Sequence, residues 1–169
     1  ENMFPLQHVI SLQSGEITSD KILEHALLFD DRDRKITVLP TATLEQALAQ
    51  LARNGIRRTA KDVIGYRDSR VWIVFPVRNT TVNADFILRY SYSSMQHIEL
   101  FLFDEAGAMT SHQLSGKFIS PQSRPINDIE YLFPFKALPN KQYLLCIRLE
   151  SLGSMQLPIS VLSSDRMHM

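Results

Sequence analysis

The sequence predicts a mainly β protein whose strands pack as a two-sheet sandwich, with one or two short helices in the N-terminal third. From about residue 70 onward, short segments rich in β-branched and aromatic residues alternate with turns. Several of these segments alternate apolar and polar residues, and clear helical periodicity is confined to residues 44–53. Short strands at regular spacing are typical of two packed antiparallel sheets.

Length and composition set the limits of the interpretation. The 169 residues, 44% of them hydrophobic and 21% charged, suit one globular domain. Eighteen basic and eighteen acidic residues cancel, which argues against nucleic acid as a partner. Cys146 is the single cysteine, so an intramolecular disulfide is excluded and the compartment stays undecided.

The chain begins with Glu1 and contains no run of roughly 20 apolar residues, the length that a membrane helix needs. We therefore expect it to be a portion of a longer protein. Within it we expect a single domain over residues 1–169, made of a mixed strand and helix lead-in (1–65) and a β-sandwich core (66–163).

The lead-in mixes both kinds of element. Ser19 or Asp20 caps a predicted short helix over residues 21–27. A longer helix is predicted over residues 44–53, because Thr43 and Gln46 have the capping-box spacing and Asn54-Gly55 follows. The remaining lead-in segments are a predicted strand over 7–12, a solvated polar loop over 29–35 and a short strand over 36–39.

The second region is predicted to be all β, with at least six strands: 71–77, 85–92, 97–103, 127–135, 142–150 and 155–162. In the second of these strands, Phe86, Leu88, Tyr90 and Tyr92 share one face, which predicts a half-buried strand. Pro76 lies inside the first, which favours a bulge or an edge strand at that point.

Common catalytic and metal-binding motifs are absent from the sequence. It contains no glycine-rich phosphate loop, no HExxH and no G-x-S-x-G, so we expect no enzyme activity and no cofactor. Cys146 lies within an apolar strand, which favours a buried, unreactive thiol. Asp31-x-Asp33 begins like a calcium loop but lacks the later ligands. A calcium site of another geometry, using Asp30, Asp31 or Asp33, stays open.

The second region resembles a known family. The residues that carry the resemblance are Ile64-Gly65-Tyr66, residues 71–79 (Val-Trp-Ile-Val-Phe-Pro-Val-Arg-Asn), Ile98–Leu102 with the Asp104–Gly107 turn, Ser123–Ile126, Leu132–Phe135, Leu138-Pro139, Tyr143–Arg148, Ser151–Ser154 and Leu157-Pro158. In order and spacing they resemble the type 2 extracellular domain of bacterial seven-transmembrane receptors with diverse intracellular signalling modules.

The resemblance spans residues 64–162 and, more loosely, the whole chain. Two features depart from the family pattern. Val74 stands where the family often has an arginine, and the predicted helix over 44–53 is longer than the family's usual connection. The first departure puts in doubt any ligand contact normally made by that arginine.

The resemblance implies a jelly-roll β-sandwich similar to carbohydrate-binding modules. It also implies a sensor placed on the periplasmic side of the bacterial inner membrane, followed by membrane helices and an output domain. That output would be a histidine kinase, a diguanylate cyclase or a phosphatase, so the parent would be a membrane signalling receptor, in some cases of the two-component type. The expected partner is a carbohydrate-like or other small ligand.

Such a ligand needs aromatic rings or charged groups on an exposed face. Trp72 is a candidate sugar platform, with a core tryptophan as the alternative. Arg124 precedes a proline at a strand start and either orients a ligand or pairs with a carboxylate. Tyr66 and Asp68 lie in the loop before the tryptophan strand.

Four mid-strand residues complete the candidate ligand site. Arg89 and Arg148 lie on the less apolar faces of their strands, where they either bind an anion or lie solvated over neighbouring side chains. His97 and Glu99 share a strand face and could join them, or form a cross-strand ion pair with an arginine.

Two other function classes remain. An interaction or dimerisation module without a small ligand would use exposed apolar residues such as Leu114, Phe118 and Ile119. A glycan-cleaving enzyme would need two facing carboxylates, for which Glu99 with Asp128 or Glu130 are the pairs to inspect.

Overall fold

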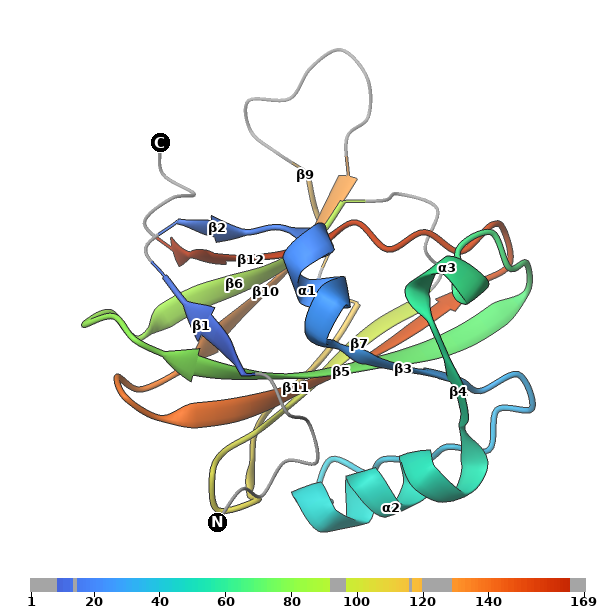
Figure 1. Ribbon diagram of the computed structural model, residues 1–169, viewed down its shortest axis with the longest axis horizontal. Helices are drawn as coiled ribbons and strands as arrows, with labels where there is room; N and C mark the ends of the chain where they lie inside the picture. Colours follow the sequence, from blue (N-terminus) through green and yellow to red (C-terminus); the bar gives the residue numbers. More distant parts are fainter. Residues whose placement is uncertain (1–8, 14, 92–96, 116, 120–128, 165–169) are drawn as a thin grey trace.

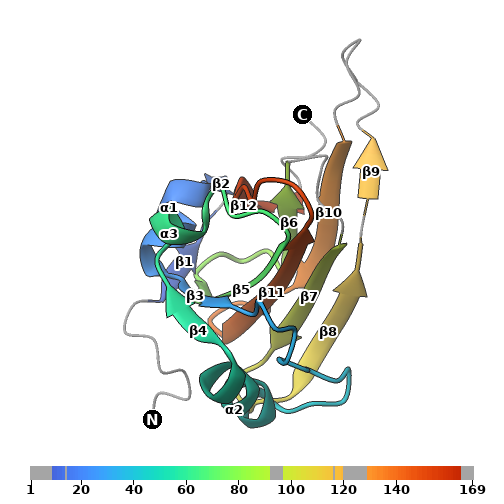
Figure 2. The same ribbon diagram turned by 90° about the vertical axis from the view of Figure 1, so that its right-hand side faces the viewer.

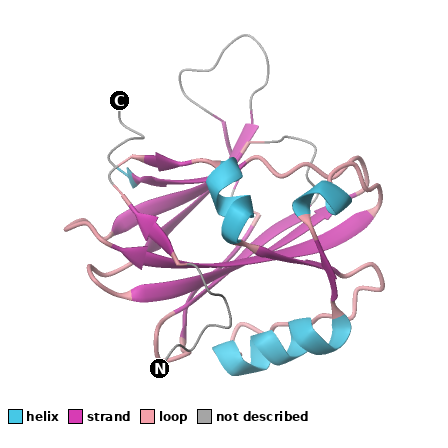
Figure 3. Ribbon diagram, in the orientation of Figure 1, coloured by secondary structure: helices cyan, strands magenta, loops and turns pink. Residues whose placement is uncertain are grey.

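The computed structural model describes residues 9–13, 15–91, 97–115, 117–119 and 129–164. Two β-sheets pack face to face, and the three helices lie outside the strand layers (Figures 1 and 3). The chain is therefore mainly β, two largely antiparallel sheets forming a sandwich with a few short N-terminal helices, as the strand pattern predicts.

Sheet A, the larger sheet, has seven strands, and its partners are antiparallel except for one short parallel pair. Its order is β4 (Ile56–Arg58), β3 (Leu27–Asp30), β5 (Ser69–Asn79), β11 (Gln142–Ser151), β7 (His97–Phe103) and β8 (Met109–Leu114). The seventh strand, β1 (Ile10–Leu12), pairs parallel with the end of β5. Sheet B has the order β2 (Glu16–Ile17), β12 (Ile159–Ser163), β6 (Asp85–Tyr90), β10 (Ile129–Lys136) and β9 (Lys117–Ile119).

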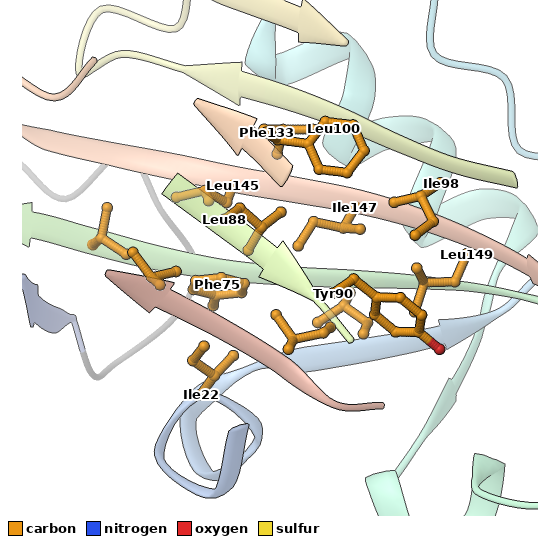
Figure 4. Packing of buried hydrophobic residues seen from close by; sticks show 14 of the residues in the cluster. Ile22, Phe75, Leu88, Tyr90, Ile98, Leu100, Phe133, Leu145, Ile147 and Leu149 are labelled. Carbon is orange, nitrogen blue, oxygen red and sulfur yellow. The ribbon is translucent and has the colours of Figure 1, made fainter. Parts of the chain in front are cut away.

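The main core lies between the two sheets. Alternate residues of β5, β7 and β11 point inward from sheet A, and alternate residues of β6, β10 and β12 meet them from sheet B. Figure 4 shows this contact, with Leu145 and Ile147 of sheet A near Leu88 of sheet B. Each fully buried side chain of this size stabilises the fold by roughly 1.5–3 kcal/mol, so this layer holds the sandwich together.

A second core covers part of the outer face of sheet A. The helix α2 (Leu44–Asn54) packs Leu44, Ala47 and Leu51 against the sheet, together with the extended segment that precedes it. The predicted capping box is confirmed, since Thr43 accepts from Gln46 N at 3.2 Å and the Gln46 side chain accepts from Thr43 N. Figure 2 shows α2 beneath sheet A.

The end of α2 approaches the sheet so closely that Gly55 is required. A Cβ atom there would lie 2.8 Å from the Leu51 carbonyl oxygen and 3.0 Å from Phe29 Cβ. Real Cβ atoms do not come this near to a backbone oxygen, so a side chain at Gly55 would distort the end of α2 and crowd Phe29 of β3. The two short helices are α1 (Ser19–His25), which buries Ile22, and α3 (Ala60–Val63), which buries Val63.

Three lead-in predictions need correction. The first helix ends at His25, and Leu27–Asp30 is a strand of sheet A and not a helix end followed by a solvated loop. Asp30 and Asp31 are each 1% exposed, because Arg32 pairs with the Asp30 carboxylate and the Lys35 N–H donates to the Asp31 carboxylate. Residues 36–39 are extended but form no strand, since they cross the outer face of the sheet without a neighbouring strand among the described residues.

Pro76 lies in neither a described bulge nor an edge strand, which corrects the prediction made from its position. β5 is interior, with β11 on one side for its whole length. On the other side its partner changes from antiparallel β3, which pairs as far as Val74, to parallel β1, which pairs from Val77. Pro76 lies in the gap between these partners, so on that side of β5 no strand pairs with the residue that lacks an N–H.

The other strand predictions are confirmed with shifts at their ends. The structure also contains β2, β4, β8 and β9, which the sequence did not predict. Of these, β4 in sheet A and β2 in sheet B come from the lead-in, so that region supplies strands to both sheets. The predictions for residues 7–8, 92 and 127–128 lie outside the described residues.

Candidate functional site

The outer face of sheet A is divided into an apolar half and a charged half. The apolar half lies under α2 and the preceding segment, and contains Trp72, Val74, Phe101 and Cys146. The charged half continues from it on the same strands. We call it the charge cluster; its members are Asp31, Arg34, Asp68, Arg70, Glu99, His112, Arg148 and Glu150.

Strand alternation positions the centre of the charge cluster. Arg148 and Glu150 are two residues apart on β11, so both side chains point to the outer face. In the ladder, Arg148 is directly opposite Glu99 of β7 and Trp72 of β5, and Glu150 is opposite Arg70. Opposite charges placed directly across a ladder attract each other, which favours this register.

The ion pairs form a continuous chain across three strands and a loop. Arg148 Nε donates to Glu99 at 2.8 Å and its Nη1 donates to Glu150 at 3.0 Å. Arg34 Nε donates to the other oxygen of Glu150 at 3.1 Å and its Nη2 to Asp68 at 3.4 Å. Every guanidinium in this chain is therefore held by two carboxylates, which fixes its orientation.

The far end of the chain is an imidazole. His112 of β8 bonds to Glu99 through Nε2, and its ring stacks on Phe101 with centroids 4.8 Å apart. Phe101 in turn stacks on Trp72 at 5.7 Å. The buried aromatic rings of the apolar half therefore support the polar groups of the charge cluster from one side.

Asp31 joins the charge cluster to the covering segment. Its carboxylate accepts from the backbone N–H groups of Lys35 (2.8 Å) and Ile36 (3.2 Å) and from Trp72 Nε1 (3.1 Å). Arg70 Nε lies 3.5 Å from the same carboxylate. Asp31 is thus the group that holds the 31–36 turn against the sheet.

The charges shift several pKa values. Burial lowers the pKa of the Arg70 guanidinium, and the nearby charge of Arg148 lowers it further. Burial alone would raise the pKa of Glu150, but the hydrogen bond from Arg34 and the charges of three arginines together lower it. The hydrogen bond to Glu150 raises the pKa of Arg34. The pairing therefore favours the charged forms of Arg34 and Glu150, whereas burial disfavours that of Arg70.

The structure brings four of the six predicted site residues together. Trp72, His97, Glu99 and Arg148 all lie on the outer face of sheet A. The Trp72 ring is 1% exposed, so it is a core residue as the alternative interpretation held, and its face is not open to a sugar. His97 is exposed and lies opposite Glu150 in the ladder.

The other two predicted residues lie apart from this group. Arg89 lies on the opposite sheet, where it bonds to Glu16 at 2.6 Å and to Ser160 at 3.2 Å. Arg89 and Arg148 therefore do not line one groove, because the two packed sheets separate them. Arg124 lies outside the described residues, as does Asp128, and the structure describes no side chain for Phe118 or Ile119.

Sequence reasoning missed four members of the charge cluster, Arg34, Arg70, His112 and Glu150, and it considered Asp31 only as a calcium ligand. Arg70 and Glu150 carried a usable signal, since each is two residues from a predicted site residue on the same strand face. His112 carried none, because β8 was not predicted. Asp31 and Arg34 lie in the turn that the polar composition of residues 29–35 made look solvated.

Three further features concern metal ligands, the cysteine and helix length. The described residues contain no group of three or more His, Cys, Asp or Glu side chains suited to a metal ion. Cys146 is buried, and burial raises the pKa of its thiol well above the usual value. In the part of the chain that the structure describes, no helix is long and apolar enough to cross a membrane.

Solved structures resemble the chain only distantly. A family 35 carbohydrate binding module from Clostridium thermocellum has 10% identity and a TM-score of 0.34, and the match covers 89% of this chain and all of that one. A tailspike protein of bacteriophage CBA120 has 8% identity and a TM-score of 0.32; the match covers 59% of this chain and 14% of the tailspike chain. A comparison with curated proteins finds no match.

A comparison with protein-family models identifies the family of this chain. Residues 35–163 match the model described as 7TMR-DISM extracellular 2, which confirms the resemblance and extends it upstream through α2. That family is one of sensor domains and is not itself catalytic. The chain therefore belongs to the 7TMR-DISM extracellular 2 family, the extracellular sensor domain of seven-transmembrane receptors with diverse intracellular signalling modules.

Proposed function

We propose that this domain senses a small polar ligand, of the carbohydrate or sugar-acid class, at the charge cluster on the outer face of sheet A. The observation that carries the proposal is the chain of ion pairs from Asp68 through Arg34, Glu150, Arg148 and Glu99 to His112. The parent receptor would lie in the bacterial inner membrane, with this domain on the periplasmic side and a histidine kinase, diguanylate cyclase or phosphatase as its output.

The charge cluster has the properties of a binding surface for hydroxyl-rich molecules. Its central side chains are partly withdrawn from water, with exposures of 10% for Arg148, 16% for Glu99 and 21% for Glu150. A ligand that covers them therefore removes little further water. Carboxylates accept from sugar hydroxyls and guanidinium groups donate to them, so one face offers both halves of that hydrogen-bonding pattern.

Arg34 gives the charge cluster a movable side. It comes from the turn after Asp31, its side chain is 38% exposed, and it contacts Glu150 and Asp68 from above the sheet. A ligand that competes for Glu150 would displace Arg34, and a sugar acid would instead attract it. Either event changes the position of the 31–36 turn, and binding would shift the receptor between two states by its differential affinity for them.

Thermal-shift measurements against glycans, sugar acids and divalent cations test the proposal. A ligand at about 100 times its Kd stabilises the native state by about 2.7 kcal/mol, which raises the Tm by about 5–10 °C for a domain of this size. We expect the same rise in an Arg89→Gln control, whose substituted side chain is on sheet B, and a much smaller rise in Glu99→Gln. A flat response of the well-folded protein across a broad panel would count against ligand sensing.

A second candidate function is self-association through β8, and one observation favours it. β8 is an edge of sheet A and carries neither proline nor lysine, the residues that commonly protect such edges, and Leu114 on it is 56% exposed. Sedimentation velocity at several concentrations distinguishes the two. A monomer at every concentration, with or without ligand, would exclude the dimer.

A further inference from the structure

Two histidines lie beside the two central carboxylates of the charge cluster. His112 of β8 bonds through Nε2 to Glu99, and His97 of β7 lies opposite Glu150 in the ladder. Imidazole is the only side chain that ordinarily changes its charge between about pH 5 and 8. The chain of ion pairs therefore ends in a group of the one kind that titrates in this range.

The hydrogen bond to Glu99 decides which ring nitrogen of His112 takes up a proton. A carboxylate can only accept, so Nε2 of the neutral ring carries the hydrogen that lies between the ring and Glu99. Nδ1 then carries the lone pair that a proton can occupy. The side chain of His112 is 27% exposed, so water reaches the ring. Protonation at Nδ1 turns the neutral hydrogen bond into an ion pair without breaking it.

The surroundings of the His112 ring direct the effect of its charge toward the charge cluster. The ring stacks on Phe101, and β8 is an edge strand of sheet A that carries no other charged residue. The charged groups that face the ring are Glu99 from β7 and, behind it, Arg148 from β11. A positive charge on the ring therefore acts first on Glu99.

Glu99 is shared between His112 and Arg148. Its Oε1 accepts from Arg148 Nε at 2.8 Å, and its Oε2 bonds to His112. When His112 is protonated, two cations compete for this carboxylate and repel each other. Glu99 is 16% exposed and Arg148 is 10% exposed, so water screens this competition less than it would at an open surface. The hold of Glu99 on Arg148 is then weaker.

The ion pairs connect this change to the turn that covers the sheet. Arg148 also donates to Glu150 at 3.0 Å, and the other oxygen of Glu150 accepts from Arg34 of the 31–36 turn. As Glu99 turns toward His112, Arg148 moves toward Glu150, and Glu150 then attracts Arg34 less strongly. The side chain of Arg34 is 38% exposed, so it has room to move away.

We propose that the charge cluster is a pH-responsive switch, in which protonation of His112 draws Glu99 away from Arg148 and loosens Arg34 and the 31–36 turn. The switch lies on the same surface as the proposed ligand site, but it does not require a ligand. A proton outside the membrane would then be a second input to the receptor, because it biases the same turn that a ligand would move.

Heteronuclear NMR of the isotope-labelled, ligand-free domain tests the switch. The Nε–Hε signals of Arg148 and Arg34 report their ion pairs, and the carbon-bound ring protons of His112 report its protonation. Between about pH 5 and 8 we expect both arginine signals to follow the His112 titration in one common step. His112→Gln should remove this step. The matched control His97→Gln should keep it, because His97 is exposed on the same sheet face and is not a member of the charge cluster.

Glu99→Gln provides a second test that does not depend on whether His112→Gln folds. The His112 ring should still titrate in this variant, but the arginine signals should no longer follow it, because the shared carboxylate is gone. Arginine signals that stay constant while His112 titrates in the parent protein, or a step that survives in His112→Gln, would overturn the proposal. These measurements contain no ligand, so the switch and ligand sensing can fail independently.

Discussion

Asp31 provides the sharpest quantitative prediction, because one buried carboxylate holds several donors. Its side chain has zero exposure and accepts from two backbone N–H groups and from the Trp72 indole, and Arg70 lies 3.5 Å away. Asp31→Asn keeps the size of the side chain but replaces one accepting oxygen with an NH2 group. That group then faces donors, and the negative charge opposite Arg70 is lost.

We expect Asp31→Asn to lower the free energy of unfolding by about 3–4 kcal/mol. A hydrogen bond to a charged group is worth about 1.5–3 kcal/mol, and at least one is lost while a buried donor is left without its partner. Removing one member of a buried ion pair costs about 3–5 kcal/mol, which gives the same range.

The control is Asp33→Asn, two residues along the same turn. Asp33 is exposed, so we expect a change within about 0.5 kcal/mol. Urea denaturation followed by circular dichroism measures both variants, and the emission of the single tryptophan reports the loss of the Trp72–Asp31 bond. A loss below about 1 kcal/mol for Asp31→Asn, or equal losses for both variants, would refute the assigned role.

Three further predictions follow from the same contacts. Arg148→Met should lower the free energy of unfolding by about 2–4 kcal/mol, because it leaves the carboxylates of Glu99 and Glu150 without their shared donor. Arg89→Met breaks a more exposed pair and should lower it by only about 0.5–1 kcal/mol in urea denaturation. Equal losses for the two variants would contradict this difference. The buried Cys146 thiol should react with a thiol reagent only after unfolding, and fast labelling of the native protein would contradict its burial. Because the pKa of Glu150 is lowered on folding, its stabilising contribution is present above its ordinary value of 4.5 and is lost as the pH falls through the folded value. Glu150→Gln should therefore flatten the acid side of the stability profile, and an unchanged slope would show that another group is responsible.

The sandwich was predictable because strand alternation is a local signal. The alternating residues of 85–90 identify the buried face of that strand without any knowledge of its neighbours. The helix over 44–53 was predictable for the same reason, since its capping box lies within four residues.

The strands that were missed lack such a signal. β8 has the sequence Met-Thr-Ser-His-Gln-Leu, whose polar residues reflect an exposed sheet edge. β3 ends in Asp30 and is followed by Asp31, and composition assigns both to a loop. Only the distant Arg58, Arg70 and Trp72 explain their burial. A pattern of a few neighbouring residues cannot identify partners that lie this far apart in the sequence.

The candidate site shows the same limit. Glu99 and Arg148 were both selected from their strands, but their pairing depends on β7 and β11 being neighbours, which the sequence does not specify. Arg89 was selected by the same criterion and lies on the other sheet. Which mid-strand charges share a face is decided by sheet order, and sheet order is a property of the whole fold.

Ligand recognition at the charge cluster, as proposed above, can be tested residue by residue. Amide chemical-shift mapping of the labelled domain, titrated with glycans and sugar acids, tests it most directly. We expect saturable shifts concentrated at Glu99, Arg148 and Glu150, and their loss in Glu99→Gln. Saturable shifts confined to sheet B and its loops, with β7 and β11 unmoved, would contradict it.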